Sequence, residues 1–373
     1  MRSLIAPNDG DNLPRWNSAF ADLANKARFF ASSGSRLHLD WTRLSSYTGS
    51  EFNIRKIFWS ILPLISRDRG RLGFAWGVSA VLALAIDGLG PTAGYAYTAA
   101  GDRNFPATLI LPQVAPSDAI WVPISTQPFG AAKPEDKTRD TNFTGTYSKL
   151  ITERLGIQFG YGLTHIDRLR SSSVTGAQNF HVMFQYETIL DPPHEFLLSV
   201  QVDHEFGGTG DQSVGSFKQS TTQPAATFAK GLGDLPIGYW RPLAITGFAG
   251  YQIAEGAPQP NMVIAGVSVQ YSIPYLVSKV ANVDLPPFLR GMTLMTELMF
   301  NVPAGRSHGQ HTMNLVAPGI SYSEGKGWEL AIEAMIPTTK ATGSGVGVIA
   351  QLVLQLDYVL PNSVAGRPIF PPH

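Results

Sequence analysis

The sequence contains no cysteine, which excludes disulfide bonds, thiolate metal sites and cysteine nucleophiles. Charged residues make up only 15% of the chain and their formal sum is zero, so no basic patch points to a nucleic acid. An apolar run at 72–86 has only about fifteen residues before Asp87, short of the roughly twenty that a membrane-spanning helix needs. Glycine (37 residues) and aromatic residues (10%) are instead plentiful among the 373 residues.

The run at 72–86 has the flanks of a secretory signal peptide. Arginines precede it and a small-residue stretch ending at Ala96 follows it, which is the order of regions in an export signal. We therefore expect 67–96 to be a signal peptide and the mature chain to begin near Tyr97; a buried core helix is the alternative. Residues 1–66 are then an upstream extension with little order, either an artefact of an early start codon or a genuine cytoplasmic prefix.

From about residue 140 onward, apolar and polar residues alternate with a period of two. In 154–166, RLGIQFGYGLTHI, the apolar Leu155, Ile157 and Phe159 are separated by glycine and polar residues. Such alternation predicts strands with one apolar and one polar face. The stretches run for about nine to thirteen residues, longer than the usual five or six of a globular sandwich and long enough for a membrane barrel. The pattern returns at 179–190, 196–206, 291–302, 328–336 and 345–358.

These strands predict an all-β fold, a transmembrane antiparallel up-and-down β-barrel of about twelve strands, rather than a secreted β-sandwich. The count includes a weak first strand at 118–127 that contains Pro123. We expect 97–141 to hold a periplasmic N-terminal segment and this first strand, and 142–373 to form the outer-membrane barrel. Aromatic residues near the strand ends suit the girdles of such barrels: Phe206, Tyr251, Tyr271, Phe300, Trp328 and Tyr358.

The connections between the expected strands alternate between short and long, which predicts an orientation. Short turns face the periplasm and longer loops face outward in outer-membrane barrels. We therefore expect loops 167–176, 207–221 and 303–310 outside the cell. The long connection 273–290 breaks the length rule, but by parity it belongs in the periplasm.

Several stretches resemble a known family: FAKGLGDLP (228–236), WRPLAITGFAGYQI (240–253), VQYSIPYLVSKV (269–280), VAPGISY (316–322), ELAIEAMIPTTKATGSGVGVIAQLVLQLDYVLP (329–361) and GRPIF (366–370). They resemble the proteobacterial outer-membrane proteins grouped with the meta-pathway phenol-degradation family. The resemblance covers about 220–370, and over 140–220 it rests on pattern alone. It implies an outer-membrane barrel with a part in the uptake of small, aromatic compounds, and it brings no catalytic residues. The end, RPIFPPH, departs from the terminal aromatic residue of many such barrels.

The polar faces of the strands supply the candidate site, a lumen lining rich in carboxylates and amides. One interpretation is structural, with the acids paired to arginines such as Arg154 and Arg241 or to an inserted segment. The other is an acidic lining that attracts cations. The expected lumen-lining residues are Gln185, Glu187, Gln201, Asp203, Glu205, Glu297, Glu329, Glu333, Gln351, Gln355 and Asp357.

Motifs for catalysis and metal binding are weak, so we expect no enzyme, no metal and no cofactor. His308 and His311 form an H-x-x-H pair, but a metal site needs a third ligand in a structured frame. His181 and His204 lie on adjacent expected strands, yet alternation places Asp203 and His204 on opposite faces. The glycines of 341–350 precede a strand rather than a helix, unlike a phosphate loop.

The sequence thus predicts a porin-like protein of the bacterial outer membrane that passes small molecules. Those molecules are expected to be small and to include aromatic or hydrophobic ones. Its expected partners are membrane lipid, a small-molecule solute and the barrel-assembly machinery, with no nucleic acid. The alternative is a closed-lumen barrel, structural or partner-binding, in which 97–141 plugs the lumen or the long loops bind a partner. An outer-membrane hydrolase is the remaining possibility.

Overall fold

The structure, a computed structural model, describes residues 98–130, 137–168, 171–256, 259–305 and 311–371. The expected extension at 1–66 and signal peptide at 67–96 therefore lie outside the described residues. Within the described ranges, every helix is too short or too polar to cross a membrane.

Strands dominate the described chain, and its helices are short. The strands are β1 (Thr98–Ala100), β2 (Arg103–Phe105), β3 (Ala119–Phe129), β4 (Thr138–Leu150), β5 (Leu155–Arg168), β6 (Val174–Ala177), β7 (His181–Asp191), β8 (Phe196–Glu205), β9 (Thr221–Gly231), β10 (Leu243–Ala254), β11 (Met262–Ser272), β12 (Met292–Pro303), β13 (Met313–Tyr322), β14 (Trp328–Pro337) and β15 (Gly347–Gln355). The helical turns are η3 (Pro192–His194), η4 (Gln212–Val214), η5 (Gly238–Trp240), α4 (Ile273–Tyr275), η6 (Leu276–Val280), α5 (Pro287–Arg290), α6 (Leu356–Val359) and η7 (Val364–Gly366).

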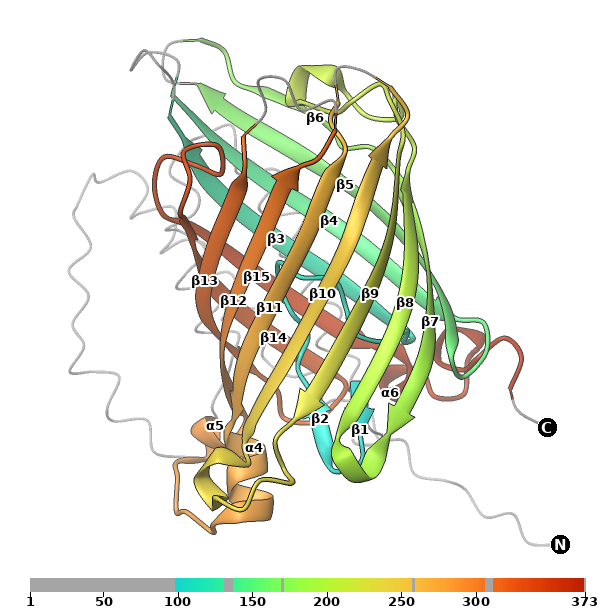
Figure 1. Ribbon diagram of the computed structural model, residues 1–373, viewed down its shortest axis with the longest axis vertical. Coiled ribbons are helices and arrows are strands. Elements are labelled where there is room, and N and C mark those ends of the chain that lie inside the picture. The colour runs from blue at the N-terminus through green and yellow to red at the C-terminus, as the bar shows by residue number, and fades with distance from the viewer. Residues whose placement is uncertain (1–97, 131–136, 169–170, 257–258, 306–310, 372–373) are drawn as a thin grey trace, which may run out of the picture. The chain divides into compact units, whose positions relative to one another are not determined.

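Twelve of these strands close into one antiparallel barrel (Figure 1). Each strand from β7 to β15 pairs with its neighbour in sequence, β15 pairs with β3, and β3 pairs with β4. The ring closes through β4–β5 and β5–β7, while the short β6 pairs with the far half of β5. The sequence-based prediction of a twelve-stranded up-and-down barrel is therefore confirmed.

The weak first strand with its internal proline is β3, and it closes the barrel between β4 and β15. Proline has no N–H to donate to a ladder. The pairing with β4 accordingly runs from Ala119 to Trp121, skips Val122 and Pro123, and resumes at Ile124 in the same register. On the other side Pro123 still lies opposite Gln351. A proline is thus tolerated in a closed sheet because only one of the two ladders is interrupted.

The outer surface of the barrel is apolar, as the alternation predicts. On β7, Phe184 is 50% exposed whereas the next residue, Gln185, is 1% exposed. Large exposed apolar side chains of this kind recur on other strands, for example Val202 on β8 and Leu294 on β12. A continuous surface of this composition far exceeds the apolar patches of soluble proteins. Because the strands are also 9 to 14 residues long, the barrel has the dimensions and the surface of one that crosses a bilayer.

The two ends of the barrel differ, and we name them by their connections. Figure 1 shows β6 at one end and α4, α5, β1 and β2 at the other. The loop end carries the connections 130–137, 169–180, 206–220, 255–261, 304–312 and 338–346. The turn end carries the connections 151–154, 192–195, 232–242, 273–291 and 323–327, together with 98–118 and 356–371.

Two expectations about the last strand and the aromatic girdle were wrong. The strand expected to run to Tyr358 ends at Gln355, because the chain then turns into α6. Of the aromatic residues expected near the rims, Phe206 and Phe300 are exposed at 40% and 41%. Trp328 and Tyr358 are instead buried, at 9% and 6% exposure.

Candidate functional site in the barrel interior

Residues 98–118, which we call the interior segment, enter the barrel at its turn end before β3 begins (Figure 1). The segment starts as a hairpin in which Thr98 pairs with Phe105. Gly101 makes the turn with φ of +62°, and a Cβ there would lie 2.3 Å from the carbonyl oxygen of Pro192. Glycine is therefore required both by the backbone conformation and by the close approach of the β7–β8 connection.

Arg103 anchors the hairpin and is 1% exposed. Its Nε lies 3.2 Å from a carboxylate oxygen of Glu195, and its guanidinium lies 3.8 Å above the ring of Tyr275. It also donates to the carbonyl oxygens of Arg241, Pro242 and Leu243. Burial lowers the pKa of Arg103, while the adjoining Glu195 carboxylate raises it. The hydroxyl of Tyr275 donates to Glu195, 2.8 Å away, which completes a buried network.

Glu297 on β12 holds the middle of the interior segment. Its carboxylate accepts hydrogen bonds from three successive backbone N–H groups, those of Leu109, Ile110 and Leu111, at 2.8, 2.9 and 3.0 Å. Glu297 is fully buried, at 0% exposure. A buried carboxylate is costly unless it accepts hydrogen bonds. Here the carboxylate and the otherwise unpaired backbone of an irregular segment satisfy one another.

Other polar side chains on the inner wall bind the rest of the segment. Glu329 accepts from the N–H of Ala107, and Glu333 lies beside Glu297. Amide and hydroxyl groups donate to the segment's carbonyl oxygens: Gln351 to Thr108 (3.2 Å), Gln185 to Gln113 (2.8 Å), Thr227 to Val114 (3.0 Å) and Ser148 to Ser117 (2.6 Å).

Two leucines of the segment insert into separate apolar clusters on the wall. Leu109 packs with Met295, Ala331 and Ile349, and Leu111 packs with Phe248, Met262 and Ile264. Partly buried methionines flank both clusters: Met335, Met299 and Met313. Methionine is flexible and fills irregular gaps, so the wall can adapt to what occupies these positions.

A buried ion pair marks the point where the interior segment becomes β3. Asp118 lies 2.5 Å from Nζ of Lys149, with side-chain exposures of 0% and 7%. The same carboxylate oxygen accepts from the N–H of Leu150, and Lys149 also donates to the carbonyl of Arg367. The pair ties together the interior segment, β4 and the C-terminal stretch.

Above the segment, toward the loop end, the barrel lumen contains an open cavity of about 390 Å³. Its floor is formed by residues 108–113, and ten of the twelve barrel strands contribute to its wall; β13 and β14 do not. Seven of the lining side chains are amides, six glutamines and one asparagine. Those amides are Gln113, Gln158, Gln201, Gln223, Gln252, Asn301 and Gln351.

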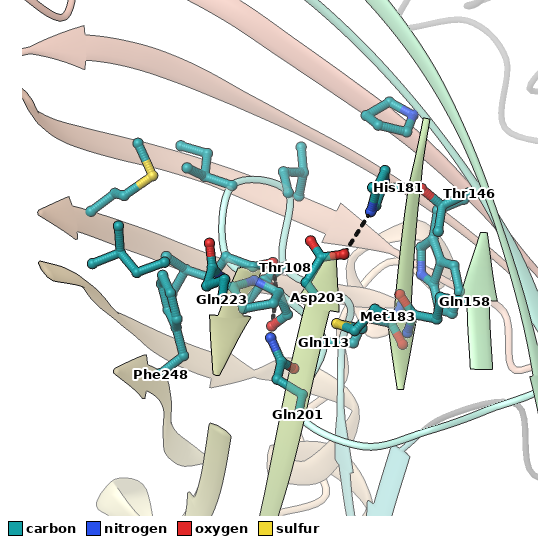
Figure 2. A pocket seen from close by; sticks show the side chains of 18 of the residues that line it. Thr108, Gln113, Thr146, Gln158, His181, Met183, Gln201, Asp203, Gln223 and Phe248 are labelled. Atoms are coloured by element: carbon teal, nitrogen blue, oxygen red, sulfur yellow. Dashed lines mark hydrogen bonds and ion pairs between the residues drawn. The ribbon is translucent and has the colours of Figure 1, made fainter. Parts of the chain in front are cut away.

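His181 and Asp203 are the ionisable residues of the cavity lining, and they contact each other. Nδ1 of His181 lies 3.1 Å from the Asp203 carboxylate, and Figure 2 shows the two side chains pointing toward one another. Their side chains are 27% and 26% exposed. The imidazole fits because β5 carries glycine opposite it: a Cβ at Gly160 would lie 1.7 Å from Nε2 of His181.

The residues expected to line the lumen divide into three groups. Glu297, Glu329 and Glu333 are at most 1% exposed and lie behind or against the interior segment. Gln185 also binds the segment, whereas Gln201, Asp203 and Gln351 border the open cavity. The other members lie away from it: Glu187 at the β7 bulge, Glu205 accepting from Asn179 at the loop end, and Gln355 near the hairpin at the turn end.

Asp357 is not where the lumen-lining prediction placed it, and the two arginines named in one alternative do not pair with the interior acids. Asp357 lies in α6 and is exposed, because β15 ends two residues earlier. Arg154 lies in the exposed β4–β5 turn, and Arg241 donates to the carbonyl of Gly233, so neither forms an ion pair with the interior acids. Of the two structural alternatives, contact with an inserted segment is the arrangement observed.

The main sequence-based prediction did not single out the residues of the interior segment. It placed 97–141 in a periplasmic segment plus the first strand, and only the closed-lumen alternative had them plug the lumen; in the structure 106–118 run within the barrel end. A usable signal was present, because 105–116, FPATLILPQVAP, is apolar yet interrupted by three prolines. Such a stretch is unsuited to a helix or a central strand but is still apolar enough to be buried.

The histidines that the sequence analysis singled out have other contacts where the structure describes them. His204 bonds Thr222 and contacts the ring of Phe206, on the face opposite Asp203. His308 lies outside the described residues and His311 is exposed. No group of three metal-binding His, Asp or Glu side chains occurs among the residues that the structure describes.

No known protein family matches the chain, so the resemblance to the phenol-degradation group is not confirmed, and no curated protein matches it either. Solved structures with a similar fold include the COG4313 outer membrane channel from Pseudomonas putida F1, 13% identical, with a TM-score of 0.44, covering 68% of this chain and 99% of that one. The KdgM porin is 10% identical (TM-score 0.39; 63% and 98% covered). LpxR from Salmonella typhimurium is 8% identical (TM-score 0.38; 63% and 99% covered). These similarities are weak, and the fold rests on the strand pairing described above.

Proposed function

We propose that the protein is a channel of the bacterial outer membrane through which small molecules pass. The observation that carries the proposal is the 390 Å³ cavity, lined by ten strands of a barrel whose outer surface is apolar. Antiparallel barrels of even strand number with an apolar exterior and a polar interior are the form that spans outer membranes. Export through the signal at 67–96 and insertion by the barrel-assembly machinery belong to the same proposal.

Passage through this lumen requires the interior segment to shift, since residues 108–113 form the floor of the cavity. Hydrogen bonds and two leucine contacts hold the floor in place. Each such hydrogen bond is worth about 0.5–3 kcal/mol net, so a shift of the floor that breaks several of them is a rare event. The solutes include small aromatic molecules, because Trp121 and Phe248 are part of the wall.

The second candidate is a structural or partner-binding barrel with a closed lumen. The three hydrogen bonds that Glu297 accepts from the interior segment favour it, because they hold the segment in the lumen. A hydrolase is less well supported, although His181 and Asp203 form a pair of the kind that can activate a nucleophile. The hydroxyl side chains of the cavity lining are those of Thr108 and Thr146, and Thr108 donates to the carbonyl of Leu111.

Conductance of the purified full chain in a planar lipid bilayer separates the two main candidates. A channel gives discrete current steps, and Glu297→Gln increases the fraction of time spent conducting because the floor is held less firmly. A matched control is Glu324→Gln, which changes a carboxylate of the β13–β14 turn that bonds Lys326. The absence of current steps from both the wild type and Glu297→Gln would favour the closed barrel.

A further inference from the structure

We propose that the cavity above the interior segment is a binding site for a small uncharged solute that carries hydroxyl or carbonyl oxygens and an apolar face. The inference rests on the proposed function and names the class of solute that it passes. It is carried by the pairing of the charged side chains in the wall, by the amide side chains of that wall and by the size of the cavity.

The first argument is that the two ionisable side chains of the lining bind each other. These side chains are His181 and Asp203, and they pair at 3.1 Å. The interior acids that the sequence suggested as a cation lining do not border the cavity: Glu297 is 0% exposed beneath the floor. When the imidazole is protonated the pair is neutral as a whole, so an ion that sheds part of its hydration here meets no net opposite charge to replace it, which costs several kcal/mol.

The second argument is the density of amide side chains. Each glutamine or asparagine offers both a donor group and an acceptor oxygen, so the wall can bind a hydroxyl or carbonyl in either direction. The seven amides come from six barrel strands and from the interior segment, so a solute in the cavity meets amide groups from several sides.

The third argument is that the lining is amphipathic and of ligand size. Trp121, Phe248 and Ile264 supply apolar surface beside the amides. A volume of about 390 Å³ lies at the lower end of the roughly 300–1,000 Å³ typical of small-molecule sites. Apolar walls with a few converging polar groups are the usual composition of such sites. A single ring bearing several hydroxyl groups satisfies both parts of this wall.

Three probes of one shape and different charge test the inference: glucose, glucosamine and glucuronate. Saturation-transfer NMR on the full chain in detergent reports which of them the protein contacts, whether or not they cross a membrane. Glucose is expected to give a transfer signal at least about fivefold above that of either charged probe. Equal signals from all three, or no signal from glucose, would overturn the inference.

A charge added to the wall provides the residue-level test. Asn301→Asp places one carboxylate in the cavity with almost no change in shape, and Gln252→Glu does so from β10 should the first variant fold poorly. Each is expected to raise the ratio of glucosamine to glucuronate binding about tenfold, equivalent to about 1.4 kcal/mol. Gln212→Glu in η4, which does not border the cavity, should leave the ratio unchanged.

The outcomes distinguish this inference from the proposed function. Selective glucose binding without conductance or solute passage would support the proposed binding site and contradict the proposed channel function. Conductance with no preference among the three probes would keep the channel and reject the site. A ratio that Asn301→Asp and Gln252→Glu leave unchanged would place any bound sugar elsewhere and likewise reject the site.

Discussion

At the scale of single residues, the interior carboxylates act as hydrogen-bond acceptors for backbone. Glu297 accepts from three consecutive N–H groups that have no strand or helix partner. This is the arrangement that a helix N-terminus offers to an anion, produced here by an irregular segment inside a barrel. The role explains why a fully buried acid is tolerated on a strand whose outward residues, such as Leu294, are apolar.

Glu297→Gln should loosen the interior segment without unfolding the barrel strands. The amide keeps one acceptor oxygen but replaces the other with a donor, so at least one N–H of 109–111 loses its partner, at a cost of about 1–3 kcal/mol. Hydrogen exchange of residues 105–114 should accelerate while the barrel strands stay protected. Unchanged exchange in this segment would contradict the assigned role, and Glu324→Gln serves as the control.

Gly160 should be intolerant of any side chain because it leaves room for His181. A Cβ would lie 1.7 Å from Nε2, so Gly160→Ala displaces the imidazole and breaks its contact with Asp203, costing about 1–3 kcal/mol of the free energy of unfolding. Gly145→Ala on β4 is the matched control, since its Cβ would meet only one atom, at 4.0 Å. Urea titrations of both variants check this, and equal stabilities would refute the steric argument.

At the scale of elements, alternation alone predicted which side chains face inward. Phe184 and Gln185 are neighbours in sequence, yet their exposures are 50% and 1%. The period of two is a local property of the extended chain, so it can be recognised without knowing which strands pair. The same reasoning placed Glu297, Glu329 and Glu333 in the interior but left open whether arginines or an inserted segment contact them there.

The interior segment could not be predicted in this way because its structure depends on distant residues. Residues 106–118 have no regular period, and their backbone partners lie on strands up to 243 positions away in sequence. The pairing of His181 with Gly160 is likewise a consequence of the β5–β7 register, which the turn between them does not reveal. Local sequence patterns therefore predict which face of a strand a side chain lies on. The strand register and the position of an inserted segment can be known only from the assembled barrel.

The β1–β2 hairpin should depend on Arg103. Arg103→Met removes the guanidinium that bonds Glu195 and three backbone carbonyls, and leaves a buried carboxylate with fewer donors, at about 3–5 kcal/mol. Limited proteolysis should then cut between residues 98 and 118. Lys279→Met, which breaks only the exposed pair with Asp102, is the control. Equal resistance of the two variants to the protease would show that the hairpin is held by something else.

At the scale of the whole molecule, the separation of connections into a loop end and a turn end predicts the orientation. Short turns of outer-membrane barrels face the periplasm. Cysteine at Ser172, exposed at the loop end, should react with an impermeant label on intact cells, while cysteine at exposed Ser278 in η6 should not. The chain has no native cysteine to confuse the result. Labelling at Ser278 but not at Ser172 would show that the barrel has the opposite orientation in the membrane.

The closed barrel, its apolar exterior and its internal cavity together lead to one central claim, passage of small molecules through the lumen. Liposomes containing the purified full chain and placed in an isosmotic solution of a neutral pentose measure this most directly. The account predicts swelling several times faster than in protein-free liposomes, with a further increase for Glu297→Gln and a decrease for Gly160→Ala, whose displaced imidazole narrows the cavity. Swelling at the protein-free rate for all three proteins would contradict it.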